Sequence, residues 1–118
     1  MERKAQINIE VQLNEEQIPQ NIIWQTNDHG VATGREVKAV LISLFDKESR
    51  DTFKLDLWTN EMQIQEMDQF IYHSLSAMAE IYKKATGNEM LYRDFSDFVQ
   101  HFGKQIQSQS PIADSGKN

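Results

Sequence analysis

Hydrophobic residues change their spacing halfway through residues 51–85. From Phe53 to Trp58 the apolar residues alternate with Lys54 and Asp56, as in a strand with one face in water. Farther along, apolar residues recur every three or four positions, which is the spacing of one helix face: Ile64, Met67, Ile71, Leu75, Met78, Tyr82 and Ala85. A strand that runs into a helix of about seven turns predicts an α+β domain rather than a bundle or a sandwich.

Two further runs before this segment predict strands. The first alternates apolar and polar residues strictly and predicts a strand with one wet face: Ile7, Ile9, Val11 and Leu13. The second is the β-prone run 22–24, which follows a polar connection containing Pro19. We therefore expect two strands in the first part of the chain.

Residues 36–46 fit either a strand or a helix. As a strand they form a hairpin with the next one, in which one apolar face is built from three cross-strand pairs: Leu44 with Phe53, Ile42 with Leu55, and Val40 with Leu57. As a helix they begin with a capping box of Thr33 and Glu36. We favour the hairpin because no Gly or Asn follows Asp46 to end a helix.

The two helices have clearer boundaries. Asn60 with Gln63 offers a capping box for the first, and Gly87 is well placed to end it. The second helix carries one apolar stripe: Leu91, Phe95, Phe98, Val99, Phe102 and Ile106.

The predicted fold is an antiparallel four-stranded meander (β-β-β-β-α-α) with two helices packed on one face. The alternative makes residues 36–46 helical and gives a three-stranded sheet with three helices. We expect a single α+β domain over residues 1–107 and a disordered polar tail over 108–118.

Composition argues against several functional classes. The net charge of −6 lacks the basic field that nucleic acids require, so we expect no nucleic-acid partner. The chain has no cysteine, and therefore no disulfide, thiolate metal site or cysteine nucleophile. No run of apolar residues is long enough for a signal peptide or a transmembrane segment. We expect a cytoplasmic protein, provided that Met1 is the natural start.

Polar residues suggest few chemical sites. Asp28 and His29 lie together in a predicted loop, but no second metal ligand follows at a useful spacing. Asp94, Asp97 and His101 share one side of the second helix, where a solvated face is the better interpretation. Nucleophile and nucleotide-binding motifs are absent from the sequence. We therefore predict no catalytic residue, no cofactor and no metal.

Large aromatic residues indicate a candidate interaction surface. Trp58 alternates to the side opposite Phe53, and in the hairpin register Phe45 and Leu41 lie on the same side as Trp58. Trp24 could join them from a neighbouring strand. Because tryptophan is enriched among binding hot spots, we predict that these residues form a protein–protein interface. The alternative is that Trp58 turns under the long helix at the end of its strand.

The chain resembles the gliding motility-associated protein GldC family. The residues that carry the resemblance are KLDLWTNEM at 54–62, EMDQF at 66–70 and KATGNEM at 84–90, with weaker support from IIWQTND at 22–28 and KAVLISLFD at 38–46. The resemblance implies a small soluble accessory protein of a gliding apparatus that works with cell-envelope lipoproteins. It implies no catalytic activity and no mapped binding residues.

The expected function is therefore that of a non-enzymatic accessory protein with a partner in the gliding or cell-envelope machinery, and homo-oligomerisation is left open. The alternative function rests on the order of the elements. Four antiparallel strands followed by two helices, on an acidic chain, are similar to the export chaperone SecB. That likeness implies a holdase or adaptor for exported or unfolded chains.

Overall fold

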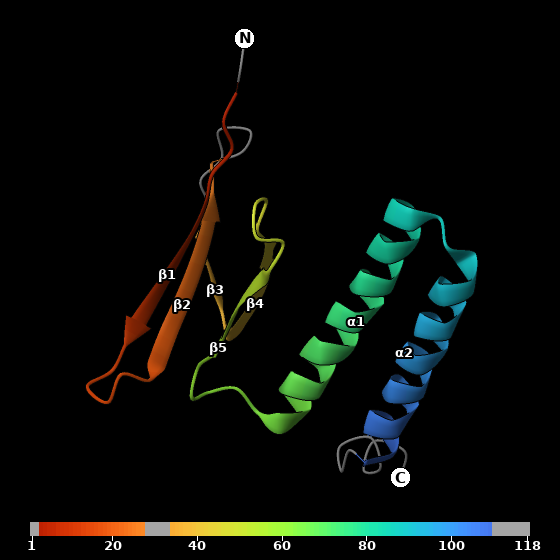
Figure 1. Cartoon of the computed structure of the whole chain (residues 1–118). Coiled ribbons are helices and arrows are strands. Elements are labelled where there is room, and N and C mark those ends of the chain that lie inside the picture. The colour runs from red at the N-terminus through yellow and green to blue at the C-terminus, as the bar shows by residue number, and fades with distance from the viewer. Residues whose placement is uncertain (1–2, 28–33, 110–118) are drawn as a thin grey trace. The chain divides into compact units, whose positions relative to one another are not determined.

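The computed structural model describes residues 3–27 and 34–109, which form strands followed by two helices (Figure 1). The elements are β1 Ile7–Leu13, β2 Pro19–Thr26, β3 Arg35–Val37, β4 Ala39–Phe45, β5 Thr52–Trp58, α1 Ile64–Thr86 and α2 Glu89–Gln109. The predicted α+β class and the order of strands before helices are confirmed. The chain divides into two compact units, residues 1–62 with the strands and residues 63–118 with the helices.

The first sheet joins β1, β2 and β3 in an antiparallel order with β2 in the centre. Ile22 of β2 is fully buried and lies between Val11 of β1 and Val37 of β3. Pro19 occupies the first position of β2, where its missing N–H is tolerated. The sheet is thus held around one aliphatic row that crosses all of its strands.

The second sheet is the β4–β5 hairpin, and its register is the predicted one. Leu44 faces Phe53, Ile42 faces Leu55, and Val40 faces Leu57, so the helical alternative for residues 36–46 is wrong. One feature of the meander differs from the prediction. The chain bends at Lys38, so that β3 pairs with β2 while β4 pairs with β5, and the strands form two sheets instead of one.

The loop of this hairpin is closed by Asp46. Its side chain accepts hydrogen bonds from the backbone N–H groups of Ser49 at 2.8 Å and Glu48 at 3.1 Å. These hydrogen bonds lower the pKa of the Asp46 carboxyl below its ordinary value, and the one from the Ser49 backbone has the largest effect. Arg50 adopts a left-handed backbone with φ of 65°. This loop explains why the hairpin register was predictable, because a short polar turn leaves the two strands little room to slip.

Helix α1 begins later than the sequence suggested and ends where predicted. Its N-cap is Gln63, whose backbone N–H donates to the Glu66 carboxylate at 3.0 Å, so the predicted box of Asn60 with Gln63 is replaced by one that starts at Gln63. At the other end Gly87 has φ of 69° and its N–H donates to the Lys83 carbonyl at 2.8 Å. Gly87 therefore ends α1 in the left-handed conformation, as expected.

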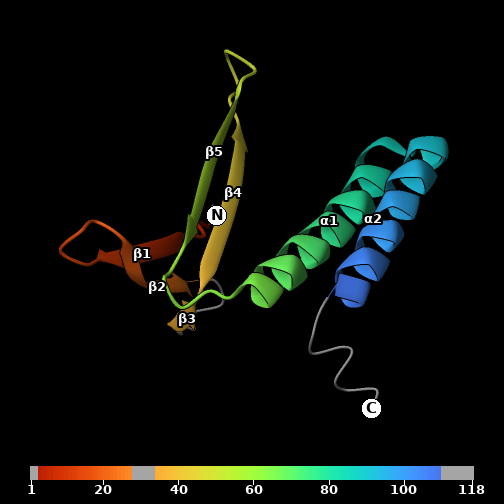
Figure 2. The ribbon, with the colours of Figure 1, turned by 90° about the horizontal axis from the view of Figure 1, so that it is seen from below.

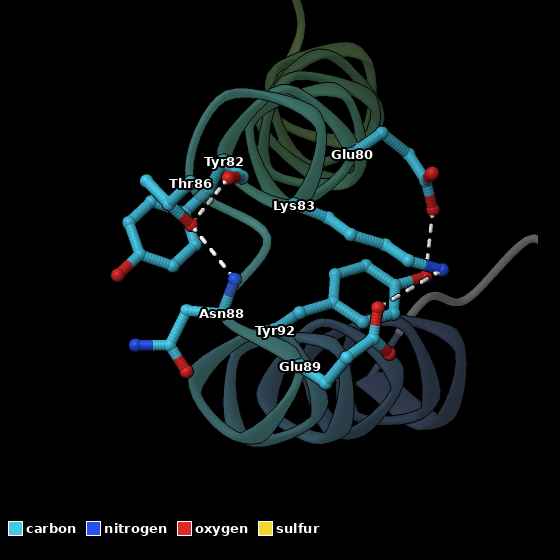
Figure 3. Close-up of polar contacts among 7 residues, drawn as sticks. All are labelled: Glu80, Tyr82, Lys83, Thr86, Asn88, Glu89 and Tyr92. Atoms are coloured by element: carbon cyan, nitrogen blue, oxygen red, sulfur yellow. Dashed lines mark hydrogen bonds and ion pairs between the residues drawn. The ribbon is translucent and has the colours of Figure 1, made fainter.

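The turn between the helices is held by side-chain hydrogen bonds (Figure 3). The Thr86 hydroxyl donates to the Tyr82 carbonyl at 2.8 Å and accepts from the Asn88 backbone N–H at 3.1 Å. The Asn88 side chain in turn caps α2 by accepting from the Leu91 N–H at 3.0 Å. These contacts order the residues on both sides of the turn.

Helices α1 and α2 lie side by side and antiparallel in Figures 1 and 2. Their contact includes the buried residues Ala79 and Val99. It also includes Gly103, where an added Cβ would lie 2.6 Å from the Tyr72 ring. Glycine at this position allows α2 to approach the ring of Tyr72 closely. Helix α2 continues to Gln109, two residues into the predicted tail, and residues 110–118 lie outside the described part of the chain.

Candidate functional site: the β4–β5 hairpin

The two faces of the β4–β5 hairpin differ in chemistry. Because paired residues share a side of the sheet, the register defines an apolar face of six residues: Val40, Ile42, Leu44, Phe53, Leu55 and Leu57. It also defines a mixed face that carries both hydrophobic and polar residues: Ala39, Leu41, Ser43, Phe45, Thr52, Lys54, Asp56 and Trp58. Figure 2 shows the hairpin along its length.

The mixed face carries most of the predicted interaction surface. Trp58 is 53% exposed, Phe45 is 70% exposed and Leu41 is 45% exposed. Trp58 faces Ala39 and is therefore a diagonal neighbour of Leu41 across the strands, within reach of a large ring. Phe45 lies at the loop end of the same face. The prediction that Trp58 and Phe45 share one accessible side of the strands thus agrees with the geometry.

Trp24 lies elsewhere. It belongs to β2, where it faces Ile9 of β1 and Arg35 of β3, and it is half-buried. Trp24 is thus in the first sheet, and it is not on the mixed face of the hairpin. The division of the strands at Lys38 is the reason, because it separates the sheet of β2 from that of β5.

The apolar face of the hairpin also carries exposed side chains. Leu44 is 61% exposed, Phe53 is 56% exposed and Leu55 is 46% exposed. The period-2 pattern identified these residues as sharing a face. Side chains of this kind, gathered on one face without polar neighbours, are the usual mark of a binding surface. The hairpin therefore offers hydrophobic area on both faces.

The helical unit is amphipathic as well. The side of α1 that meets α2 is marked by three residues. Tyr72 lies against Gly103, Ala79 is buried, and Lys83 lies over the Tyr92 ring. The apolar stripe of α1 lies roughly a quarter turn away, at 100° per residue, and includes Ile64, which is 81% exposed.

The stripe of α2 is rotated in the same sense from its own contact side, and it includes the exposed residues Leu91 and Phe98. Equal rotations of two antiparallel helices bring both stripes to the same side of the pair. The helical unit thus has one apolar side and one polar side.

An open groove of about 640 Å³ lies between the helices on the polar side. Its lining includes Tyr72, Gln69, His73, Gln100 and Lys104. The groove offers amide, hydroxyl and imidazole groups. Over residues 3–27 and 34–109 no three histidine or acidic side chains are grouped so that they could hold a metal ion.

Of the remaining polar candidates, those that the structure describes form no such group. Asp94, Asp97 and His101 are exposed on α2. Asp28 and His29 lie outside the described residues.

Near the turn between the helices, the Tyr92 hydroxyl donates to the Glu80 carboxylate at 2.7 Å, and this hydrogen bond raises the pKa of Tyr92 above its ordinary value (Figure 3). Lys83 lies 4.7 Å from the centre of the Tyr92 ring. These contacts join α1 to α2 and have a structural role.

Comparison with protein families identifies the chain. The model of the family described as "Gliding motility-associated protein GldC-like" matches residues 19–108, which run from the start of β2 nearly to the end of α2. The chain belongs to the GldC-like family. The resemblance found in the sequence is thereby confirmed. No curated protein and no solved structure matches this GldC-like chain significantly. Within the described residues, neither helix combines the length and the hydrophobicity needed to cross a membrane.

Proposed function

We propose that this GldC-like protein is a non-enzymatic accessory component of the gliding machinery that binds a protein partner through the mixed face of its β4–β5 hairpin. The family assignment supports a role in gliding motility. The observation that carries the proposed mechanism is the exposure of Trp58, Phe45 and Leu41 on one face of a two-stranded sheet. The proposal includes a cytoplasmic location.

The chemistry of the mixed face fits protein recognition. Lys54 and Asp56 lie beside Trp58 on β5, and they give this face a polar part next to the hydrophobic residues. Interfaces are commonly built in this way, with a hydrophobic centre and a polar rim. Tryptophan is among the residues that contribute most to such interfaces because of its large area.

The contribution of Trp58 can be estimated from its exposure. A tryptophan buries about 200–250 Å², so the 53% that is accessible corresponds to about 120 Å². At 25 cal/mol per Å² this area is worth about 3 kcal/mol, or roughly a hundredfold in Kd. Removal of this side chain is therefore expected to be easily detected.

The test is a pull-down from lysate of the source cell with immobilised wild-type protein, Trp58→Ala and Phe53→Ala. Phe53 is a matched control because it lies on the same strand, is exposed to a similar extent and points to the opposite face. We expect a partner that wild type and Phe53→Ala retain and that folded Trp58→Ala loses, with circular dichroism to verify folding. If Trp58→Ala captures the same partner as strongly as wild type does, the mixed face is not the interface.

A second candidate function is supported by the apolar face. A holdase needs accessible hydrophobic surface without strong sequence preference, and Leu44, Phe53 and Leu55 provide such a surface on an acidic chain. Aggregation of a chemically denatured model protein, followed by light scattering, separates the two candidates. Suppression of aggregation that Phe53→Ala weakens and Trp58→Ala does not would favour the holdase.

A further inference from the structure

The outer edge of β5 is open in the described part of the chain. β5 pairs with β4, and no other described strand hydrogen-bonds to it. An isolated two-stranded hairpin is marginally stable in water, and an unpaired strand edge is a template for another strand. β5 therefore lacks the second neighbour that a strand in a stable sheet usually has.

Backbone hydrogen bonds show which residues face that open edge. The Asp46 N–H donates to the Asp51 carbonyl, and the Thr59 N–H donates to the Lys38 carbonyl, at opposite ends of the hairpin. In an antiparallel pair the hydrogen-bonded positions alternate, so the odd-numbered residues of β5 point their N–H and C=O groups at β4. The even-numbered residues point theirs outward: Thr52, Lys54, Asp56 and Trp58.

We propose that two copies of this chain associate by antiparallel pairing of their β5 strands about a two-fold axis at Leu55. An isologous pairing must join outward-facing residues to outward-facing residues, which restricts the register to steps of two. About Lys54 or Asp56 the axis would place two like charges opposite each other. About Leu55 it places Lys54 of each copy opposite Asp56 of the other.

The same register also matches the remaining side chains. Phe53 of one copy faces Leu57 of the second copy, and Leu55 faces Leu55, so the two apolar faces become continuous. The outward-facing positions form about eight backbone hydrogen bonds. Neither Lys54 nor Asp56 forms a hydrogen bond or ion pair with another side chain within residues 3–27 and 34–109, so both remain available for the second copy.

The charges provide a direct test by size-exclusion chromatography with light scattering on the full chain. Wild type is expected at about 27 kDa, twice 13.7 kDa. Each of the variants Lys54→Asp and Asp56→Lys places like charges opposite each other at two positions of the dimer. We expect each to raise the Kd of the dimer at least tenfold, and a tenfold change corresponds to a loss of about 1.4 kcal/mol in binding free energy. A mixture of the two variants restores both opposite-charge pairs and is expected to form a heterodimer. Lys47→Asp, with the same charge change in the hairpin loop, is the control and should remain dimeric.

A cysteine crosslink tests the axis independently of charge. Directly opposed residues in a non-hydrogen-bonded antiparallel pair have Cα atoms about 4.5 Å apart, within the range for a disulfide. Because the natural chain has no cysteine, Leu55→Cys should give a single disulfide-linked dimer on mild oxidation. Ser43→Cys, exposed on β4 and facing Lys54 within the hairpin, should remain monomeric on a denaturing gel.

The outcomes separate this inference from the proposed function, on which it does not rest. A monomeric wild type, a mass unaffected by Lys54→Asp and Asp56→Lys, or equal crosslinking of Leu55→Cys and Ser43→Cys would each overturn the β5 pairing. A Leu55→Cys variant that forms the disulfide-linked dimer and still captures the partner supports the pairing and leaves the proposed function intact, because Leu55 lies on the face opposite Trp58. A dimeric Trp58→Ala that loses the partner supports both.

Discussion

Gly103→Ala tests how closely the two helices pack. The added Cβ would lie 2.6 Å from Tyr72 Cε1 and 3.2 Å from its Cδ1 and Cζ, whereas carbon atoms normally approach to about 3.5–4.0 Å. Overpacking of this kind destabilises by about 1–3 kcal/mol. Alanine is also the better helix former by about 1 kcal/mol. We therefore expect a net loss of about 1 kcal/mol in the free energy of unfolding.

The two contributions can be separated by removing the ring. In a Tyr72→Ala background the clash disappears, and Gly103→Ala should then stabilise α2 by about 1 kcal/mol. In a Tyr72→Phe background the ring remains and the substitution should destabilise as in wild type. Urea unfolding followed by circular dichroism at 222 nm measures all of these free energies. If the effect of Gly103→Ala is the same with and without the ring, within about 0.5 kcal/mol, the close contact does not exist.

Two further predictions concern the turns. Gly87→Ala should lower the free energy of unfolding by about 1–2 kcal/mol because φ is 69° and no neighbouring atom lies within 4 Å to add a steric effect; Gly87→Asn, which tolerates this conformation, should lose less in the same urea assay. The pKa of Asp46 is lowered in the folded chain, so its ionised form contributes stability above the unfolded pKa of about 3.9 and loses it as the pH falls through the folded pKa. Asp46→Asn should therefore be less stable than wild type at pH 7, with a difference that shrinks below about pH 4; a difference that is constant from pH 7 to pH 3 would contradict the role of the Asp46 charge.

The strand register was the most predictable part of the fold. Alternation assigns each side chain of β4 and β5 to a face, and the short loop from Asp46 to Asp51 leaves one pairing that puts like with like. The end of α1 was predictable for a similar local reason, because Gly87 alone among its neighbours adopts a left-handed backbone without strain. Both features depend on residues that are close in sequence.

The candidate site was predictable only in part. Alternation correctly put Trp58, Phe45 and Leu41 on a common face. It also grouped Leu44, Phe53 and Leu55, yet it could not show that these residues are exposed. Periodicity reports which side chains lie together, while their exposure depends on what the rest of the molecule places against them.

Residue patterns along the chain were therefore enough to predict the family, the α+β class, the hairpin register and the C-terminal cap of α1. The folded chain was needed to show that the strands divide at Lys38 into two sheets, so that Trp24 and Trp58 belong to different sheets. It also shows that α1 contacts α2 through Tyr72 and Gly103, and that the most hydrophobic stripe of α1 lies outside this contact. Both features depend on contacts between residues that are distant in the sequence. In such contacts one small residue, here Gly103, can set which sides of two helices meet, whatever the hydrophobic pattern of each helix predicts.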